Sequence, residues 1–437
     1  MKYFGTDGIR EKADKFTPEF LTKIVAGLVD YAGTDIKVFL AGDTRESTEW
    51  ILADLESALE TFGVEYANAG VLPTPAINYC FYEMGFSFAI DVTASHNPYV
   101  DNGIKIFERG KTHGQKLCEK GCEFIENSLI SAKTYALSSP TLRENLHSEA
   151  VELYKNHLET YLGKTDFTGL KIGLDCANGA TSVINKSVFE NLGATVELIN
   201  ADEAYGQKIN NDCGSTHLEQ LKSLVKENSL DFGAAFDGDG DRVLMVDENG
   251  NEVDGDEIIA ILTDYLKLDK IAITVMANQG LLNWVTKNQI SAEITPVGDT
   301  NVAIVMREKN IKLGGEQSGH IILPNQNTGD GMLTALMVTK IAAKTKKSLK
   351  ELANIITKFP QIIVNLDATP EQKQSFKDGI AENLLKEYEE KLISVSGRLL
   401  VRPSGTENLI RITMWGNNKD KITALANALK NDLAEIL

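Results

Sequence analysis

The segment DGDGDR (237–242) places three aspartates, Asp237, Asp239 and Asp241, at alternate positions. Side chains two residues apart project to the same side of an extended chain, and the intervening glycines let the backbone curve, so the three carboxylates can converge. Unit charges about 4 Å apart repel by about 4 kcal/mol at an effective dielectric of about 20, so converging carboxylates favour a bound cation. Their all-oxygen donor set is typical of Mg²⁺, Mn²⁺ or Ca²⁺ rather than zinc.

Two other structures compete with a metal site in this segment. A solvated acidic turn stays open as an alternative, because Asp and Gly are common turn formers. An EF-hand loop requires glycine at its sixth position and a helix after it. Arg242 occupies that position and the following VLMV is typical of a strand, so we exclude the EF-hand.

Ser95 lies in the segment TASHNP (93–98), directly after the apolar run FSFAIDV, which predicts a buried strand. α/β proteins place their chemistry where strands end and loops begin. An octahedral Mg²⁺ held by three aspartates keeps room for a phosphate oxygen, and a serine that carries a phosphoryl group would complete such a site. Pro98 disfavours helical geometry at Asn97 and so predicts a sharp exit from the strand.

His96 and Lys105 are the titratable neighbours of Ser95 in the sequence. Neighbouring side chains on an extended chain point apart, so we predict that Ser95 and His96 form no simple catalytic pair and that His96 supports the loop. Lys105 follows a predicted DNG turn and lies on the strand GIKIF. Its ammonium would balance phosphate charge or donate a proton, with an exposed surface lysine as the alternative.

The segment GGEQSGH (314–320) places Glu316, Ser318 and His320 at alternate positions. Alternation predicts that the carboxylate, the hydroxyl and the imidazole share one face, where they would suit sugar hydroxyls. A polar hairpin without a binding role is the alternative.

The segment RPSGTENLIR (402–411) surrounds a glycine turn with Arg402, Ser404, Thr406 and Arg411. Guanidinium groups, two hydroxyls and open backbone N–H groups suit a phosphate. The Walker lysine pattern is absent from this segment, so no nucleotide site is implied.

The composition limits the classes of partner. The chain has 437 residues, of which 44 are basic and 62 acidic, for a net charge of -18. This charge argues against nucleic acid or an anionic membrane as the main partner, although a few local cations can still bind a phosphorylated small molecule. No apolar run approaches a membrane span, MKYFGTDGIR lacks the apolar core of a signal peptide, and five cysteines without a CxxC pair predict reduced thiols in a cytoplasmic protein.

Three segments share one pattern, in which a short apolar strand, a small polar turn with glycine and a helical pattern follow one another. They are KVFLAGDTRES from Lys37, KIGLDCANGAT from Lys171 and IAITVMANQGLL from Ile271. Each is typical of a βα unit, so we predict an α/β protein of tandem similar domains with mostly parallel sheets. Alternating charged and apolar residues over 143–164 predict an amphipathic connecting helix, and the NG dipeptide in RVLMVDENGNEV predicts a hairpin.

We expect domain boundaries after the start of the connecting helix, after the hairpin and at Pro360, which interrupts the helical pattern SLKELANIITK. These boundaries give three α/β domains and a smaller C-terminal α+β domain. Their ranges are 1–150, 151–253, 254–360 and 361–437.

Taken together, TASHNP with DNGIK, DGDGDR, GGEQSGH and RPSGTEN resemble, one for one and in order, the four active-site loops of the α-D-phosphohexomutases. The N-terminal FGTDGIR (4–10) also matches this family, so the resemblance covers essentially the whole chain. It implies four domains around a central cleft, each contributing one loop. Within the family, MKYFGTDGIR and Gln317 make the sequence most similar to the branch that interconverts glucosamine 6-phosphate and glucosamine 1-phosphate.

The resemblance assigns a role to each matching residue. Ser95 would be the phosphoserine, and its phosphate would join Asp237, Asp239 and Asp241 on Mg²⁺. The phosphoryl-transfer site would also contain Arg10, His96, Lys105 and Arg242. The sugar-binding residues would be Glu316, Ser318 and His320, and the phosphate-binding residues would be Arg402, Ser404, Gly405, Thr406 and Arg411.

The implied reaction passes a phosphoryl group between Ser95 and a phosphorylated hexosamine, with glucosamine 1,6-bisphosphate or another hexose bisphosphate as intermediate and primer. Its product would feed UDP-N-acetylglucosamine and cell-wall synthesis. The alternatives are a phosphomannomutase or phosphoglucomutase, a hydrolase with the same serine and metal, and a non-catalytic phosphosugar-binding protein of the same fold. We expect a cytoplasmic monomer or homodimer with no nucleic-acid or membrane partner.

Two residues depart from the family's pattern. Glu11 follows Arg10 where glycine is common, and Asn408 stands where proline is usual. Both lie beside matched positions, so they bear on loop rigidity and local charge rather than on the matched residues themselves.

Overall fold

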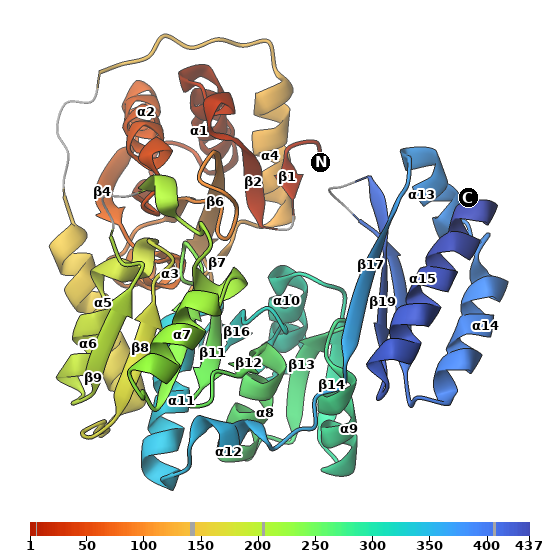
Figure 1. Cartoon of the computed structure of the whole chain (residues 1–437). Coiled ribbons are helices and arrows are strands. Elements are labelled where there is room, and N and C mark those ends of the chain that lie inside the picture. Colours follow the sequence, from red (N-terminus) through yellow and green to blue (C-terminus); the bar gives the residue numbers. More distant parts are fainter. Residues whose placement is uncertain (6, 140–144, 203–205, 405–407) are drawn as a thin grey trace. The chain divides into compact units, whose positions relative to one another are not determined.

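The computed structural model describes residues 1–5, 7–139, 145–202, 206–404 and 408–437 (Figure 1). The chain forms two compact units. The first contains Met1–Thr274 and Glu293–Ile355, and the second contains Val275–Ala292 and Ile356–Leu437. Among the described residues, no helix is long and apolar enough to cross a membrane.

The first sheet has the strand order β1-β2-β6-β5-β3-β4, with β7 paired to β6. Only β4, β3 and β5 pair in parallel, so the sheet is mixed, with the expected parallel pairing in one part. The physical reason is the short loop from β5 to β6, because a connection of less than about a dozen residues joins antiparallel strands. The strands are β1 (Phe4–Gly5), β2 (Gly8–Lys12), β3 (Lys37–Gly42), β4 (Glu65–Val71), β5 (Phe88–Val92), β6 (Asp101–Arg109) and β7 (Gly114–Lys116).

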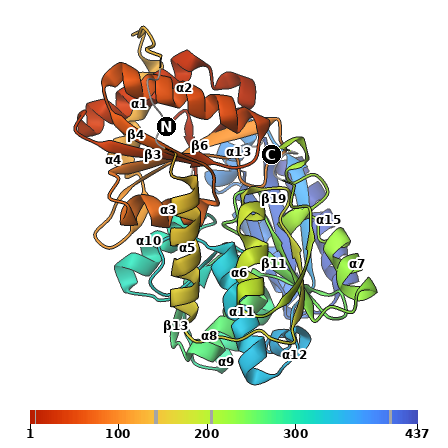
Figure 2. The same cartoon turned by 90° about the vertical axis from the view of Figure 1, so that its left-hand side faces the viewer.

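Helices cover both faces of this sheet, which is why β3 is buried from Val38 to Gly42 and β5 along its whole length. Val38 and Leu40 of β3 pack in one core with α1, α2 and α4, whereas Phe39 points to the opposite face, which α3 covers. Figure 2 shows α1 and α2 on one side of the sheet and α3 on the other. The helices are α1 (Pro18–Ala32), α2 (Glu46–Phe62), α3 (Thr74–Glu83), α4 (Glu119–Ile130) and α5 (His147–Leu162), with the short turn η1 (Ala13–Lys15).

The second sheet has the strand order β12-β11-β10-β8-β9, in which β10, β8 and β9 are parallel and β11 and β12 are antiparallel. Leucines and valine of α7 pack on one face, and α11 contacts β10 and β11. The elements are β8 (Lys171–Asp175), η2 (Ala180–Val183), α6 (Asn185–Asn191), β9 (Thr195–Ile199), η3 (Gly206–Lys208), η4 (Gly214–Thr216), α7 (Glu219–Glu227), β10 (Phe232–Phe236), β11 (Val243–Asp247) and β12 (Glu252–Val253).

The third sheet has the strand order β14-β13-β15-β16, with β13 and β15 parallel and β16 antiparallel. Val302 and Met306 of α10 pack against Ala272 and Ile322 on this sheet. The elements are α8 (Gly255–Leu266), β13 (Lys270–Thr274), α9 (Gln279–Lys287), β14 (Ser291–Thr295), α10 (Asp299–Lys309), β15 (Gly314–Gly315), β16 (Ile321–Ile322), α11 (Gly331–Thr345) and α12 (Leu349–Ala353).

The second unit contains an antiparallel sheet of order β17-β19-β18 with a core of its own. Leu429 and Leu433 of α15 are fully buried against this sheet together with Leu392 of α14. This α+β arrangement agrees with the expected strand, helix, strands and helix. The elements are β17 (Gln361–Asp367), α13 (Pro370–Lys377), α14 (Glu382–Ile393), β18 (Arg398–Pro403), β19 (Leu409–Trp415) and α15 (Lys419–Ile436).

Most predicted elements are present. The connecting helix is α5, whose buried stripe includes Val151, Tyr154 and Leu158, and the NG dipeptide joins β11 to β12 as a hairpin. The DNG segment is not a turn. Asp101–Arg109 is continuous strand, and the turn lies earlier, where the Asp101 N–H donates to the Pro98 carbonyl. The boundaries at 150, 253 and 360 stay predictions, and α5 runs across the first of them.

Candidate active site

Ser95 emerges at the carboxyl end of β5, as the sequence predicts, and is fully buried. Its backbone is left-handed, with φ of 52°, a conformation that few non-glycine residues adopt. The hydroxyl donates a hydrogen bond to Oδ2 of Asp237 at 2.7 Å, across 142 residues of sequence. The loop after β5 and the loop after β10 therefore meet at this serine.

His96 does contact Ser95, so the prediction that the two side chains point apart is wrong. Nδ1 of His96 lies 3.3 Å from Oγ of Ser95. The alternation rule holds for extended backbone, and the left-handed Ser95 breaks it. Burial, with Arg242 and Arg10 nearby, lowers the pKa of His96 to about 3, so the imidazole is neutral at physiological pH.

The three aspartates converge as predicted in the turn between β10 and β11. Asp237, Asp239 and Asp241 are all buried, and one oxygen of each lies within 4.8 Å of the others. Among the described residues, Oδ1 of Asp239 and Oδ1 of Asp241 are buried without a hydrogen-bond partner. Burial and the two neighbouring carboxylates raise the pKa of Asp237 well above its usual value, so the cluster carries a charge conflict that a cation would relieve.

These features fit a hard divalent cation. The donor set consists of carboxylate oxygens, two of which accept no hydrogen bond among the described residues and could serve as ligands. The cluster is also too buried to be the solvated turn considered above. Magnesium prefers such oxygen ligands and commonly shares them with a phosphate.

Lys105 is not a surface residue. It lies on β6, opposite Asp91 of β5, and its Nζ contacts Asp239 at 2.6 Å, Asp241 at 3.1 Å and Asp7 at 3.2 Å. Burial opposes its charge, but the surrounding carboxylates raise the pKa of Lys105 well above its usual value. The ammonium is therefore held in its cationic form, which suits it to balance phosphate charge rather than to exchange a proton.

The two predicted arginines lie at this cluster on different parts of the chain. Arg10 on β2 pairs with Asp7 at 2.5 Å. The Arg242 N–H donates to Oδ1 of Asp237 at 3.1 Å, and its Nε lies 3.8 Å from Oδ1 of Asp241. The structure thus brings Lys105 and Arg242 into contact with the aspartates, and Arg10 into contact with Asp7, which also pairs with Lys105.

The GGEQSGH segment is a tight turn between β15 and β16 rather than an extended strand, so the expected alternation on one face is wrong. The Gly319 N–H donates to the Glu316 carbonyl, and Gly319 has φ of 92°, which closes the turn. Glu316 and His320 are buried, but Ser318 is exposed. Closely spaced glycines favoured this turn over a strand.

His320 still reaches the aspartates from the third sheet, and Glu316 is an electrostatic neighbour of Arg242. Oε1 of Glu316 accepts the Gly298 N–H at 3.0 Å. Nε2 of His320 accepts the Gly329 N–H at 3.2 Å and lies 3.5 Å from Oδ2 of Asp299 and 3.9 Å from Oδ2 of Asp241.

Three charged residues of this cluster were missed by the sequence reasoning. Lys116, the last residue of β7, contacts Oδ1 of Asp7 at 2.5 Å and also pairs with Asp299 at the start of α10. Burial alone would raise the pKa of Asp7, but Lys105, Lys116 and Arg10 hold it well below its usual value. Asp7 stands inside the matched FGTDGIR, which was a usable signal, whereas nothing in the sequence connects Lys116 with Asp299.

The RPSGTENLIR residues belong to the second unit. Arg402 on β18 and Arg411 on β19 are directly opposite in an antiparallel pair, so they share one face of the sheet. Ser404 is buried just after β18. Gly405 and Thr406 lie outside the described residues.

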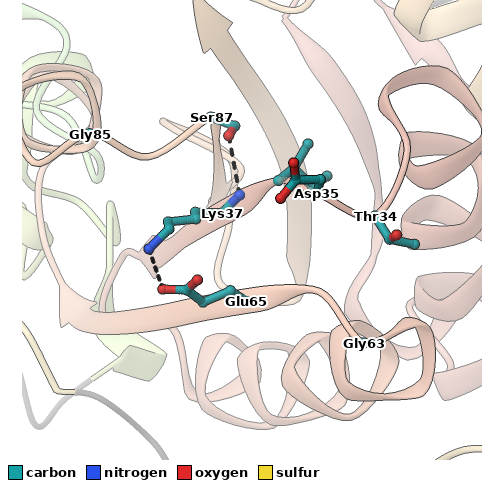
Figure 3. A pocket seen from close by; sticks show the side chains of 8 residues that line it. Thr34, Asp35, Lys37, Gly63, Glu65, Gly85 and Ser87 are labelled. Carbon is teal, nitrogen blue, oxygen red and sulfur yellow. Dashed lines mark hydrogen bonds and ion pairs between the residues drawn. The ribbon is translucent and has the colours of Figure 1, made fainter.

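A separate surface hollow of about 310 Å³ lies in the first sheet's domain (Figure 3). Its lining includes Lys37, Glu65 and Ser87, which lie at or just before the amino ends of the parallel strands β3, β4 and β5. Lys37 and Glu65 neutralise each other at 2.6 Å. Ser95 follows the carboxyl end of β5, the edge where α/β sheets bind ligands, so this hollow is not the candidate site.

Comparison with known proteins covers the chain in four parts. The family models for phosphoglucomutase/phosphomannomutase match residues 1–131 (alpha/beta/alpha domain I), 152–250 (alpha/beta/alpha domain II), 254–359 (alpha/beta/alpha domain III) and 339–431 (C-terminal domain). The fold is therefore the α/β fold predicted, with three α/β/α domains and a C-terminal domain.

Individual relatives are similar to the chain over nearly its whole length. The phosphoglucosamine mutase of Caldicellulosiruptor bescii is 40% identical over 98% of each chain, and that of Streptococcus agalactiae serotype III is 41% identical over 94% of this chain and 93% of its own. Two solved structures share the fold. Paramecium phosphoglucomutase has a TM-score of 0.77 at 19% identity, covering 99% of this chain and 94% of its own. Aspergillus fumigatus N-acetylphosphoglucosamine mutase, in complex with GlcNAc-6P and magnesium, has a TM-score of 0.67 at 17% identity, covering 99% and 96%. The chain belongs to the phosphoglucomutase/phosphomannomutase family.

Proposed function

We propose that the chain is a mutase that interconverts glucosamine 6-phosphate and glucosamine 1-phosphate through phospho-Ser95 and a sugar bisphosphate. The family membership makes it an isomerase that moves a phosphoryl group within a sugar. The amino-sugar substrate rests on relatives of 38 to 41% identity that carry the name phosphoglucosamine mutase.

One observation carries the catalytic assignment. The Ser95 hydroxyl, fully buried, lies 2.7 Å from Asp237 within a group of three carboxylates, of which Asp239 and Asp241 contact the cationic Lys105. A phosphate on Ser95 would lie next to carboxylates that suit a divalent cation and that already pair with Lys105 and Arg242. Phosphoryl transfer requires such an arrangement, since its catalysis is mainly positioning and charge stabilisation.

In the first half of the reaction, the bond between Oγ of Ser95 and phosphorus breaks and a bond from phosphorus to the sugar hydroxyl forms. The sugar hydroxyl loses its proton, and the serine oxygen regains one and again donates to Asp237. The proton that the sugar hydroxyl loses balances the one that the serine oxygen regains, and Nδ1 of His96 lies 3.3 Å from that oxygen. Lys105 stays cationic throughout and offsets phosphate charge. After the bisphosphate turns over, the other phosphate returns to Ser95.

We assign Mg²⁺ to Asp237, Asp239 and Asp241, where it would offset phosphate charge when bound. We assign sugar binding to Glu316 and His320, with the exposed Ser318, and phosphate binding to Arg402, Ser404 and Arg411 together with Gly405 and Thr406. Glucosamine 1,6-bisphosphate would serve as intermediate and primer, and the product would supply UDP-N-acetylglucosamine synthesis. We assign a cytoplasmic location and a monomer or homodimer.

The test compares three substrates with one preparation primed with glucose 1,6-bisphosphate. We expect glucosamine 6-phosphate to be turned over at least tenfold more efficiently than mannose 6-phosphate or glucose 6-phosphate, measured as kcat/KM. The Ser95→Ala variant should lose at least about a thousandfold in kcat, because the covalent carrier is gone.

Three results would contradict this assignment. A tenfold preference for mannose or glucose phosphate would change the substrate, and steady release of inorganic phosphate would indicate a hydrolase. Unchanged turnover by Ser95→Ala would remove the covalent mechanism and leave a phosphosugar-binding protein of this fold as the better interpretation.

A further inference from the structure

Arg45 is a fully buried arginine that neither the sequence motifs nor the proposed mechanism uses. It lies between β3 and α2, in the sequence GDTRES, and its side chain is 0% exposed. Burying a guanidinium is costly unless each of its donors is satisfied. The partners of Arg45 are therefore informative about what the residue does.

Those partners are the backbone carbonyls of the Ser95 loop. Nη2 donates to the carbonyls of Ser95 at 3.0 Å and Asn97 at 2.9 Å. Nη1 donates to the carbonyls of Pro98 at 2.6 Å and Asp101 at 3.2 Å. One guanidinium thus binds three carbonyls of the loop that connects β5 to β6 and the carbonyl of the first residue of β6.

Asp43 anchors the guanidinium and links it to the amide of Ser95. Nε of Arg45 donates to Oδ2 of Asp43 at 2.9 Å, and the Thr93 hydroxyl donates to the same oxygen at 2.7 Å. The Thr93 hydroxyl in turn accepts the Ser95 N–H at 2.9 Å. Both backbone polar groups of Ser95 are therefore held by this one network.

Asn210, in the segment between η3 and η4, also binds two of these carbonyls. Nδ2 of Asn210 donates to the carbonyls of Ser95 at 2.8 Å and Asn97 at 3.1 Å. These contacts hold Ser95 in its left-handed conformation, with φ of 52°, which an L-residue adopts only when its surroundings fix it. That conformation is what turns the hydroxyl toward Asp237.

We propose that Arg45 is the positioning residue of the Ser95 loop: through four backbone carbonyls it holds the Ser95 hydroxyl in line with the aspartate cluster. The expected effect of Arg45 on turnover rests on the proposed function, whereas its role in holding the Ser95 loop does not. A lysine cannot replace the arginine here, because a compact ammonium lacks the fork of donors that reaches four acceptors.

The experiment compares Arg45→Lys with the wild type and with Arg109→Lys. Arg109 is a matched control, because it also donates to two backbone carbonyls, those of Tyr82 and Phe86, but lies at the far end of β6. We expect Arg45→Lys to lower kcat by about 100-fold with KM within about threefold of wild type, since a shift of about 1 Å at a reacting group costs that much. Arg109→Lys should keep kcat within about twofold.

Hydrogen–deuterium exchange of the segment 93–101 gives a readout that does not depend on turnover. Arg45→Lys should raise exchange there, and Arg109→Lys should not. If Arg45→Lys does not fold, Asn210→Ala decides, with an expected tenfold loss of kcat and faster exchange in the same segment, because two of the contacts to Ser95 and Asn97 are removed.

Unchanged exchange in 93–101, or faster exchange with kcat within about threefold of wild type, would overturn the positioning role. An inactive wild type would instead contradict the proposed mutase, while the exchange experiment would still decide whether Arg45 holds the loop.

Discussion

At the scale of single residues, the three aspartates of the cluster differ in how well nearby cations neutralise them. Lys105 stabilises Asp239 and Asp241 by direct contact, whereas the partners of Asp237 within the described residues are a hydroxyl, a backbone N–H and a guanidinium 4.0 Å away. The cluster is thus only partly neutralised by the chain's own cations. This imbalance gives a divalent ion a favourable place beside Asp237 and beside Ser95.

Magnesium should therefore stabilise the folded protein. A ligand at about 100 times its dissociation constant contributes about 2.7 kcal/mol, so saturating Mg²⁺ should raise the melting temperature measurably. Asp241→Asn should remove most of this rise, because Oδ1 of Asp241 is one of the two buried oxygens that accept no hydrogen bond among the described residues. The measurement is differential scanning fluorimetry with and without MgCl₂ after treatment with EDTA.

The control for this measurement is Asp264→Asn, which changes an exposed carboxylate on α8. It should keep the full magnesium response. An equal response in Asp241→Asn and the wild type would show that the ion binds elsewhere, and EDTA-treated enzyme with full turnover would show that no ion is needed.

At the scale of elements, α11 depends on a buried aspartate at its start. Asp330 is the N-cap of α11, where it accepts the Leu333 N–H, and its Oδ2 accepts the Tyr154 hydroxyl from α5 at 2.7 Å. Burial raises the pKa of Asp330 to about 6 from an ordinary value of 3.8. The folded state thus binds the proton more tightly than the unfolded chain does.

This shift predicts the sign of a pH effect. Below about pH 4 Asp330 is protonated in both the folded and the unfolded state. As the pH rises from about 4 to 6, the unfolded chain releases this proton while the folded protein keeps it, which favours unfolding. Wild-type stability therefore falls by about 3 kcal/mol for a shift of this size. The Asp330→Asn variant should not lose this stability, because an asparagine side chain does not titrate. Calorimetry at pH 4.5 and 7.5 should show the variant gaining stability relative to the wild type as the pH rises.

Ser348→Ala is the control that removes a helix N-cap without changing a charge. Ser348 caps α12 through its hydroxyl and does not titrate in this range, so its variant should cost about 1 kcal/mol at both pH values. A difference between Asp330→Asn and wild type that stays constant with pH would contradict the raised pKa.

At the scale of the whole molecule, the parts of the site that are local in sequence could be predicted. The alternation of Asp237, Asp239 and Asp241 and the place of Ser95 after an apolar strand need only the geometry of a few residues. The contact between Ser95 and His96 could not be predicted, because nothing in the sequence marks a serine with positive φ. That conformation is imposed by Arg45, about 50 residues away in the chain.

The same limit applies to the fold. Strand and helix patterns located the βα units and the C-terminal domain, since burial on one or both faces leaves a periodic signal. Contacts such as that of Lys116 with Asp299 join elements 183 residues apart, and they follow from how the sheets pack rather than from any local pattern.

Each unit has a core of its own, and this separation predicts which strands a core mutation destabilises. Leu429 of α15 is fully buried in the core of the second unit, and Leu59 of α2 is fully buried in that of the first sheet's domain. Truncating either to alanine leaves a cavity that costs about 2 to 5 kcal/mol. Leu429→Ala should therefore accelerate hydrogen exchange in β17, β18 and β19, while β3 and β5 keep their wild-type rates.

Leu59→Ala makes the reciprocal change and is the matched control, with faster exchange expected in β3 and β5 and none in β17 to β19. Because both variants delete the same atoms from equally buried sites, a difference in where exchange rises reports on the cores and not on the substitution. If Leu429→Ala accelerates exchange in β3 and β5 as much as in β19, the two cores unfold as one cooperative body, and the division into two units does not describe the molecule's stability.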